Sequence, residues 1–105
     1  MTGCTIRLLE EAQQDLLAGK SFYEKQQPGL GAYFWDSLLA DIESLQIHAG
    51  VHQRCFDYHR MLAKRFPYAL FYELSPQYIT VVAVLPLRRS PTWLANQFRE
   101  RDSKS

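Results

Sequence analysis

The feature that most constrains the fold is a pair of apolar runs, residues 68–74 and 78–86, separated only by Ser75-Pro76-Gln77. Val, Leu, Phe and Tyr are frequent in both runs, a composition typical of buried β-strands. A connection this short forces the two strands to be antiparallel neighbours. Neither run alternates regularly with polar residues, which indicates that the sheet is covered on both of its faces.

The first half of the chain supplies a cover for one face, in the form of two amphipathic helices. Leu9 begins a stripe of residues at helical spacing, with acidic and amide side chains mostly on the other side. Gln26-Gln27-Pro28-Gly29 breaks this helix. A second stripe runs from Leu30 to about Ile47 and ends at Ala49-Gly50, the pattern of a C-terminal cap. The short break predicts an antiparallel helical hairpin.

Shorter segments complete the predicted domain. Met1–Leu8 is typical of a short first strand, and residues 58–65 of a further strand, while residues 51–57 are expected to be irregular. Ser90–Leu94 is predicted to be a short terminal helix with Pro91 in its first turn. Because the helical hairpin covers only one face of the sheet, the other face requires either the C-terminal segment or another chain.

These elements predict a single α+β domain of order β-α-α-β-β-β, with the helical hairpin packed on a small, mainly antiparallel sheet. The length of 105 residues fits one domain, which we expect over residues 1–98. The polar residues 99–105 are expected to form a frayed tail. At helical or strand spacing, aromatic side chains belong to the core more often than to a base-stacking platform. On this ground the core is expected to hold Phe22, Tyr23, Phe34, Trp35, Phe71 and Tyr72.

The net charge of +1 hides an uneven distribution. Residues 1–50 carry three basic and seven acidic side chains, whereas residues 51–105 carry nine basic and four acidic ones. The near-neutral total implies no bulk affinity for polyanions, but the asymmetry permits one basic face. The alternative is that the two halves of the chain neutralise each other.

Cysteine usage and hydropathy favour a cytoplasmic protein. Cys4 and Cys55 lack metal-ligand spacing and are expected to be reduced, buried thiols. No stretch approaches the ~20 apolar residues of a membrane span, and no signal peptide is visible. His48 and His52 have no third ligand spaced nearby, and no phosphate-binding glycine loop occurs. Neither a metal nor a cofactor is therefore expected.

The order of several short motifs resembles the RelE/ParE superfamily of bacterial toxins, whose members are also called plasmid stabilisation proteins. The resemblance extends from about residue 5 to residue 94. The matching pieces are Ala12, Asp15-Leu16, Phe22-Tyr23-Glu24, Gly29-Leu30-Gly31, Phe34, Arg60, Lys64-Arg65-Phe66-Pro67-Tyr68, Phe71-Tyr72-Glu73, Val81, Val84, Arg88-Arg89, Pro91 and Trp93. No single piece is specific, but their order and spacing together are.

The resemblance implies the toxin component of a type II toxin–antitoxin system. Such a toxin is neutralised by a cognate antitoxin, whose C-terminal segment would dock in an apolar groove of the sheet. RelE-like members cleave messenger RNA in the ribosome, and ParE-like members inhibit DNA gyrase. Neither a membrane nor a small-molecule ligand is expected as a partner. A non-toxic relative that only binds its antitoxin is a third alternative.

The candidate target-binding or catalytic residues are cations near the ends of the predicted strands, namely Arg60, Lys64, Arg65, Arg88 and Arg89. Strand alternation predicts that Arg60 and Lys64 lie on one face and Arg65 on the other. Arg60, Lys64 and the Arg88-Arg89 pair could then form one basic patch. The alternative is a solvated rim without a specific role.

Two departures from the RelE pattern favour the ParE branch. The arginine that RelE-like toxins carry early in the strand after the turn corresponds to Ala69, and Trp93 stands near the place of their C-terminal tyrosine. An indole N–H is too weak an acid to donate a catalytic proton. Tyr58 and His59 remain as acid or base candidates, although His59 is predicted to face away from Arg60. We therefore expect a gyrase inhibitor that acts by binding, with Trp93 on a partner surface, and a metal-independent ribonuclease as the alternative.

Overall fold

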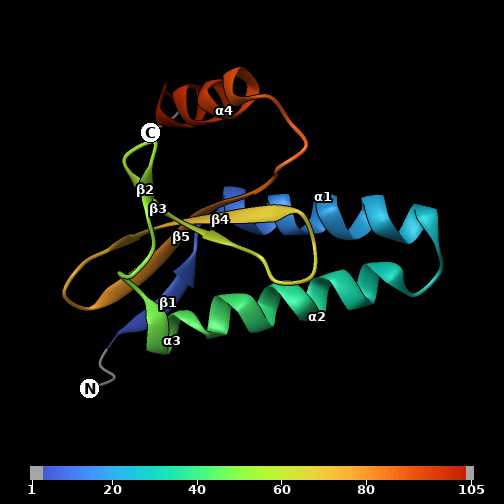
Figure 1. The fold of residues 1–105 in the computed structure, drawn as a ribbon, viewed down its shortest axis with the longest axis horizontal. Helices are drawn as coiled ribbons and strands as arrows, with labels where there is room; N and C mark the ends of the chain where they lie inside the picture. The colour runs from blue at the N-terminus through green and yellow to red at the C-terminus, as the bar shows by residue number, and fades with distance from the viewer. Residues whose placement is uncertain (1–3, 104–105) are drawn as a thin grey trace.

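A five-stranded mixed sheet forms the middle layer of the protein (Figure 1). The computed structural model describes residues 4–103. In chain order, the elements are β1 (Thr5–Leu8), α1 (Glu10–Gln26), α2 (Leu30–Glu43), α3 (Leu45–His48), β2 (Arg54–Cys55), β3 (Tyr58–Leu62), β4 (Tyr68–Leu74), β5 (Tyr78–Pro86) and α4 (Pro91–Ser103). The strand order is β1-β5-β4-β3-β2, with β1 parallel to β5 and the other pairs antiparallel. The predicted α+β fold and its mainly antiparallel sheet are confirmed.

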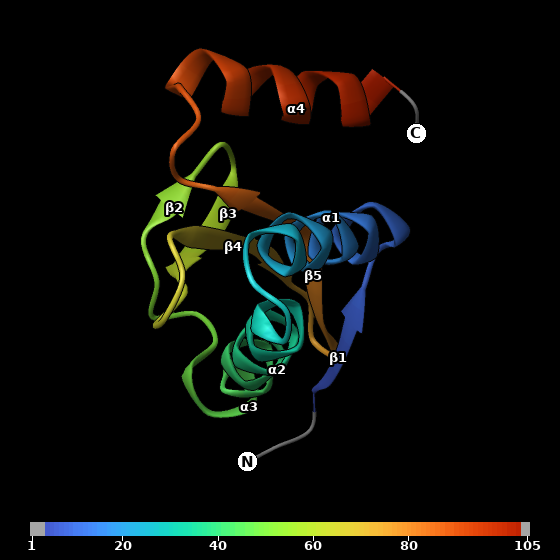
Figure 2. The same ribbon diagram turned by 90° about the vertical axis from the view of Figure 1, so that its right-hand side faces the viewer.

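The helices α1 and α2 form the predicted antiparallel hairpin and cover one face of the sheet (Figures 1 and 2). The buried residues of α1 are Ala12, Leu16 and Gly19, which all belong to the stripe seen in the sequence. Ala12 and Leu16 pack with α2 and the strands in one apolar cluster that includes Phe34 and Tyr72. Periodicity alone was sufficient to identify this layer because the apolar face of each helix is continuous.

The turn between the two helices is held by Glu24. Its carboxylate accepts hydrogen bonds from the backbone N–H groups of Gly29, at 3.1 Å, and Gly31, at 3.0 Å. Gly29 has a φ of 90°, a left-handed conformation that glycine adopts without strain. The Gln-Pro-Gly break therefore works as a tight reversal that brings α2 back along α1.

The helix α4 covers the opposite face of the sheet, which corrects the expectation of an open apolar groove there. Figure 2 shows α4 on one side of the strands and α2 on the other. Phe98 is 7% exposed and belongs to a second apolar cluster with Phe71, Val82 and Leu85. Of the two covers that the sequence left open, the C-terminal segment is the one found. Both faces of β4 and β5 are thus buried, as their apolar composition indicated.

The same helix is longer than the sequence indicated. It begins at Pro91, as predicted, but residues 99–103 continue it instead of forming a frayed end. Arg101 explains the extension, because its guanidinium binds the carboxylate of Asp15 through both Nη atoms, at 2.9 and 2.8 Å. Residues 104–105 of the expected tail lie outside the described part. None of the helices within residues 4–103 is long and apolar enough to cross a membrane.

Three other boundaries differ from the prediction. The segment 51–57 contains β2, which pairs with β3 through a two-residue turn at Phe56 and Asp57. Both turn residues have positive φ values, 55° and 69°. Such turns normally carry Asn or Gly, so the sequence lacks the usual signal. The strand β3 ends at Leu62 instead of residue 65, and Ser44 separates α2 from α3 within the helix expected to reach Ile47.

Candidate functional site

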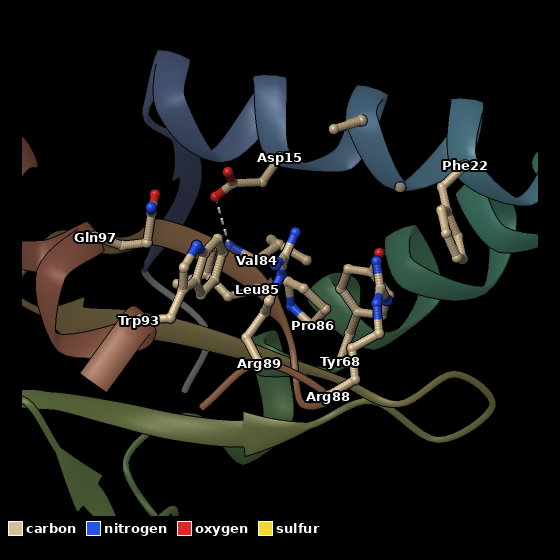
Figure 3. A pocket seen from close by; sticks show the side chains of 12 residues that line it. Asp15, Phe22, Tyr68, Val84, Leu85, Pro86, Arg88, Arg89, Trp93 and Gln97 are labelled. Atoms are coloured by element: carbon tan, nitrogen blue, oxygen red, sulfur yellow. Dashed lines mark hydrogen bonds between the residues drawn. The ribbon is translucent and has the colours of Figure 1, made fainter. Parts of the chain in front are cut away.

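A hollow of about 280 Å³ lies between α1, the end of β5 and the start of α4 (Figure 3). Three elements meet there, so residues far apart in the sequence become neighbours. Its lining is Asp15, Ala18, Gly19, Phe22, Tyr68, Val84, Leu85, Pro86, Arg88, Arg89, Trp93 and Gln97. Three of the residues singled out from the sequence, Arg88, Arg89 and Trp93, therefore come together.

The turn after β5 positions the two arginines. The N–H of Leu87 donates to the carbonyl of Pro67 at 2.8 Å, which fixes the chain as it leaves the sheet. The hydroxyl of Ser90 then accepts the N–H of Trp93 at 3.1 Å, an arrangement that caps the first turn of α4. Arg88 and Arg89 stand between these two anchors and are both exposed.

Each arginine lies against an aromatic ring from a different helix. The guanidinium carbon of Arg88 is 4.3 Å from the ring centroid of Phe22 on α1. That of Arg89 is 4.9 Å from the ring centroid of Trp93 on α4. Cation–π contacts of this kind orient the guanidinium groups without neutralising their charge. The mouth of the hollow therefore carries two oriented positive charges.

Asp15 also borders the hollow, but its carboxylate is already engaged. It accepts the N–H of Val84 at 3.0 Å and both Nη atoms of Arg101. Burial raises the pKa of Asp15 above its ordinary value, and the hydrogen bonds from Arg101 and Val84 oppose this effect. The carboxylate is therefore a structural anchor for α4 and β5, with its lone pairs directed at these donors.

The cations on and after β3 are not part of this site. Arg60 lies opposite Phe71 in the β3–β4 register, which places it on the face covered by α4. Lys64 and Arg65 are exposed in the turn after β3, and the backbone N–H of Lys64 donates to Asp41 at 3.1 Å. The predicted alternation of Lys64 and Arg65 does not apply, because the strand has already ended. None of the three lines the hollow.

The acid or base candidates lie on two different faces of β3. His59 lies opposite Tyr72, and their rings stack with centroids 5.1 Å apart on the α1–α2 side. It therefore faces away from Arg60, as strand alternation predicts. Tyr58 shares the face of Arg60 and packs against the ring of Phe98.

Tyr72, His52 and the backbone of Gly50 form a hydrogen-bonded cluster on the α1–α2 side. The Tyr72 hydroxyl accepts the N–H of Gly50 at 2.9 Å and contacts Nδ1 of His52. The carbonyl of His52 in turn contacts Nδ1 of His59 at 3.0 Å. Burial lowers the pKa of His52, and burial raises the pKa of Tyr72. Among the described residues, no group of three or more His, Cys, Asp or Glu side chains could hold a metal ion.

Sequence reasoning missed part of the site. Phe22 was expected in the core, yet it is 39% exposed and carries Arg88 on its ring. Asp15 and Gln97 had no predicted role, although both line the hollow. One signal was present for Phe22, since it lies at the edge of the helical stripe next to Tyr23. The positions of Asp15 and Gln97 depend on where α4 docks, which no local pattern reveals.

No family model matches the sequence, and no curated protein matches it. The protein is similar to one chain in a solved structure, which is described as "Chromosomal ParDE TA system from P. aeruginosa". The TM-score is 0.75 at 14% sequence identity, over 84% of this chain and 100% of that chain. At this identity the likeness establishes the fold. The ParE-like fold that the sequence motifs implied is therefore confirmed.

Proposed function

We propose that the protein is the toxin component of a type II toxin–antitoxin pair, acts in the cytoplasm and is neutralised by a cognate antitoxin. The observation that carries this proposal is the likeness to a chain of a ParDE toxin–antitoxin system, which is matched over its full length. The ordered sequence motifs that resemble the RelE/ParE superfamily support the same function. The fold leaves the target open, so the target is argued from the site.

DNA gyrase is the proposed target, and binding alone is the proposed mode of inhibition. The support comes from the hollow at which Arg88, Arg89 and Trp93 meet. Two oriented cations and an indole are suited to holding a partner. General acid–base catalysis needs a proton donor or acceptor within reach of the reacting group. No histidine lines this hollow among the described residues, Asp15 is committed to Arg101, and the phenol that borders it belongs to Tyr68, which is only 3% exposed.

A ribosome-dependent ribonuclease is the second candidate function. One observation favours it: Tyr58 and Arg60 share a face of β3, so a phenol and a guanidinium lie on the same side of the sheet. Two observations oppose it. Ala69 stands where RelE-like toxins carry an arginine, and it is only 1% exposed. Part of this face, moreover, is covered by α4.

The test is controlled expression of the protein in bacterial cells. A gyrase poison is expected to stop growth, cause a supercoiling defect and an SOS response, and leave a reporter transcript intact in primer extension. Codon-phased cuts in the transcript, with normal supercoiling, would instead support the ribonuclease. Normal growth would leave only a non-toxic antitoxin-binding relative.

The double substitution Arg88→Ala with Arg89→Ala tests the site itself. We expect reduced growth inhibition, because the hollow loses both positive charges. Affinity for the cognate antitoxin is expected to change by less than about threefold, since we assign these arginines to the target and exposed charge pairs contribute little to binding. Lys64→Ala with Arg65→Ala removes the same charge elsewhere and serves as the control. Lost antitoxin binding with unchanged toxicity would instead assign Arg88 and Arg89 to the antitoxin.

A further inference from the structure

Arg88 and Arg89 present unused hydrogen-bond donors at the mouth of the hollow. A guanidinium that stacks on a ring by its face still offers its N–H groups along its edge. Within residues 4–101, neither side chain has an ion pair or a hydrogen bond, and the only salt bridge there joins Arg101 to Asp15. A pair of fork-shaped donors held in place by Phe22 and Trp93 is suited to oxyanions, above all carboxylates and phosphates.

The floor of the hollow indicates what must be attached to that oxyanion. Val84, Leu85 and Pro86 of β5 and the small residues Ala18 and Gly19 of α1 line it, while the neutral polar groups beside them belong to Tyr68, which is buried, and to Gln97, whose oxygen accepts from Arg101. The one carboxylate at its border is occupied by Val84 N–H and Arg101. A buried nucleobase needs partners for its polar edge. A floor of this composition favours an aliphatic or aromatic side chain instead.

The size of the hollow also favours a single side chain as its occupant. About 280 Å³ lies below the roughly 300–1,000 Å³ of pockets that bury a whole small molecule. The space is suited to a single large side chain. An apolar side chain that enters between two unpaired arginines is best accompanied by negative charges on either side of it in its own chain.

We propose that this hollow binds a protein segment in which one large apolar residue is flanked by carboxylates. The apolar side chain enters between α1 and α4, and Arg88 and Arg89 bind the flanking carboxylates by their N–H edges. The inference rests on the proposed function in one respect, because it takes this segment to belong to the target protein. The inference distinguishes a protein target from a nucleic-acid target at the same site. A phosphate group alone would bind the arginines without contacting the apolar floor of the hollow.

Two neighbouring positions on α1 allow the hollow to be blocked with a matched control. Ala18 is exposed and lines the hollow, so Ala18→Trp fills the space without disturbing the core. Leu17 is 53% exposed on the same helix but does not line the hollow, so Leu17→Trp adds an indole outside it. The double substitution Arg88→Gln with Arg89→Gln removes both charges. The double substitution Arg88→Lys with Arg89→Lys keeps the charges but loses the planar, fork-shaped set of guanidinium donors.

The indole N–H signals of the two tryptophans report binding by NMR. Trp93 lines the hollow, whereas Trp35 lies on α2 beneath Lys20 and serves as an internal reference. The probes are the blocked tripeptides acetyl-Glu-Leu-Glu-amide and acetyl-Gln-Leu-Gln-amide, and the trinucleotide UUU. Each is titrated into the isotopically labelled full chain, to a ligand concentration of about 10 mM, which detects millimolar affinities.

The acidic peptide is expected to shift the Trp93 signal and leave the Trp35 signal in place. The neutral peptide should bind the unsubstituted protein at least about tenfold more weakly than the acidic peptide does. The acidic peptide should lose at least about tenfold in affinity for the double Gln variant, and less for the double Lys variant. Ala18→Trp should abolish binding, and Leu17→Trp should retain it. The proposal is overturned if the acidic peptide leaves Trp93 unshifted, if both peptides bind equally, or if UUU binds at least as tightly.

Growth inhibition by the same variants distinguishes this inference from the proposed function. If Ala18→Trp remains as toxic as Leu17→Trp, the hollow is not the target site, although the protein is still a toxin. If the unsubstituted protein does not inhibit growth, the toxin proposal fails. The NMR result then decides independently whether the hollow recognises an acidic, apolar segment.

Discussion

Gly19 lies at a close approach of α1 to the ring of Phe34 in the core. An added Cβ would stand 2.4 Å from Cζ of Phe34 and 3.2 Å from the hydroxyl of Tyr68. Phe34 is fully buried, and its ring is held by Tyr23 and Phe66. The ring therefore has little room to yield.

Gly19→Ala is accordingly expected to destabilise the protein by about 1–3 kcal/mol, as overpacked cores do. Without the clash, the same change in a helix would be stabilising by up to about 1 kcal/mol. Urea denaturation measures the difference, with Ser21→Ala on the exposed side of α1 as the control for helix propensity. Unchanged or increased stability of Gly19→Ala would mean that Phe34 can shift.

His52 makes stability depend on pH. Its pKa is lowered from 6.5, chiefly by burial and further by the charges of His48 and His59. In the neutral ring, Nδ1 can accept a hydrogen bond from the Tyr72 hydroxyl, which itself accepts one from the N–H of Gly50. The folded protein therefore binds fewer protons at this site than the unfolded chain does.

The stabilisation due to neutral His52 is fully present above about pH 6.5 and is lost as the pH falls through the folded pKa. We expect a lower free energy of unfolding at pH 5 than at pH 7.5, and His52→Asn should reduce this difference. His48→Asn, at an exposed position, removes one of the charges that lower the His52 pKa, so it should reduce the pH dependence by less than His52→Asn does. Equal pH dependence in the His52 variant and the unsubstituted protein would contradict the prediction.

Among the elements, α4 is held by a small number of side chains. Phe98 is its only buried residue within 91–101, and its ring lies 4.9 Å from that of Phe71, 5.2 Å from Phe56 and 5.4 Å from Tyr58 by centroid. The second anchor is the ion pair of Arg101 with Asp15. Trp93 and Leu94 add partly buried contacts, but an element with one buried side chain and one ion pair opens more readily than the helical hairpin does.

Phe98→Ala is expected to raise amide hydrogen exchange throughout α4 while α1 and α2 keep their protection. The free energy that holds α4 on the sheet should fall by an amount approaching the roughly 3–5 kcal/mol typical of truncating a buried Phe. Hydrogen exchange of the native protein provides the measurement, with Glu100→Ala on the exposed side of α4 as the control. If exchange in α4 stays unchanged, Phe98 is not the anchor.

At the scale of the whole molecule, the two halves of the chain contribute different things to one site. The acidic first half provides α1, with Phe22 and Asp15, and the basic second half provides Arg88, Arg89 and the docking helix. The hollow exists only because α4 folds back over the sheet and reaches α1 through Arg101. The uneven charge of the sequence therefore gives a site in which two arginines, without ion pairs to residues 4–101, lie beside apolar residues.

The sequence by itself determined the helical hairpin, the strands β4 and β5, and the ParE-like order of elements. These features follow from local periodicity, turn residues and continuous apolar composition, all of which act over a few residues. It also correctly indicated that the sheet needed a second cover. The sequence did not identify this cover because α4 has no long apolar stripe. Trp93, Leu94, Phe98 and Arg101 show their contacts only after the helix has docked.

Only the tertiary structure decided which cations share a site. Arg60, Lys64 and Arg65 seemed equivalent to Arg88 and Arg89 in the sequence, yet the end of β3 at Leu62 and the position of α4 separate them. Such pairings join residues from α1, β5 and α4, so they depend on the packing of whole elements. Packing of this kind results from many contacts between residues far apart in the sequence, so the spacing of residues along the chain does not predict it.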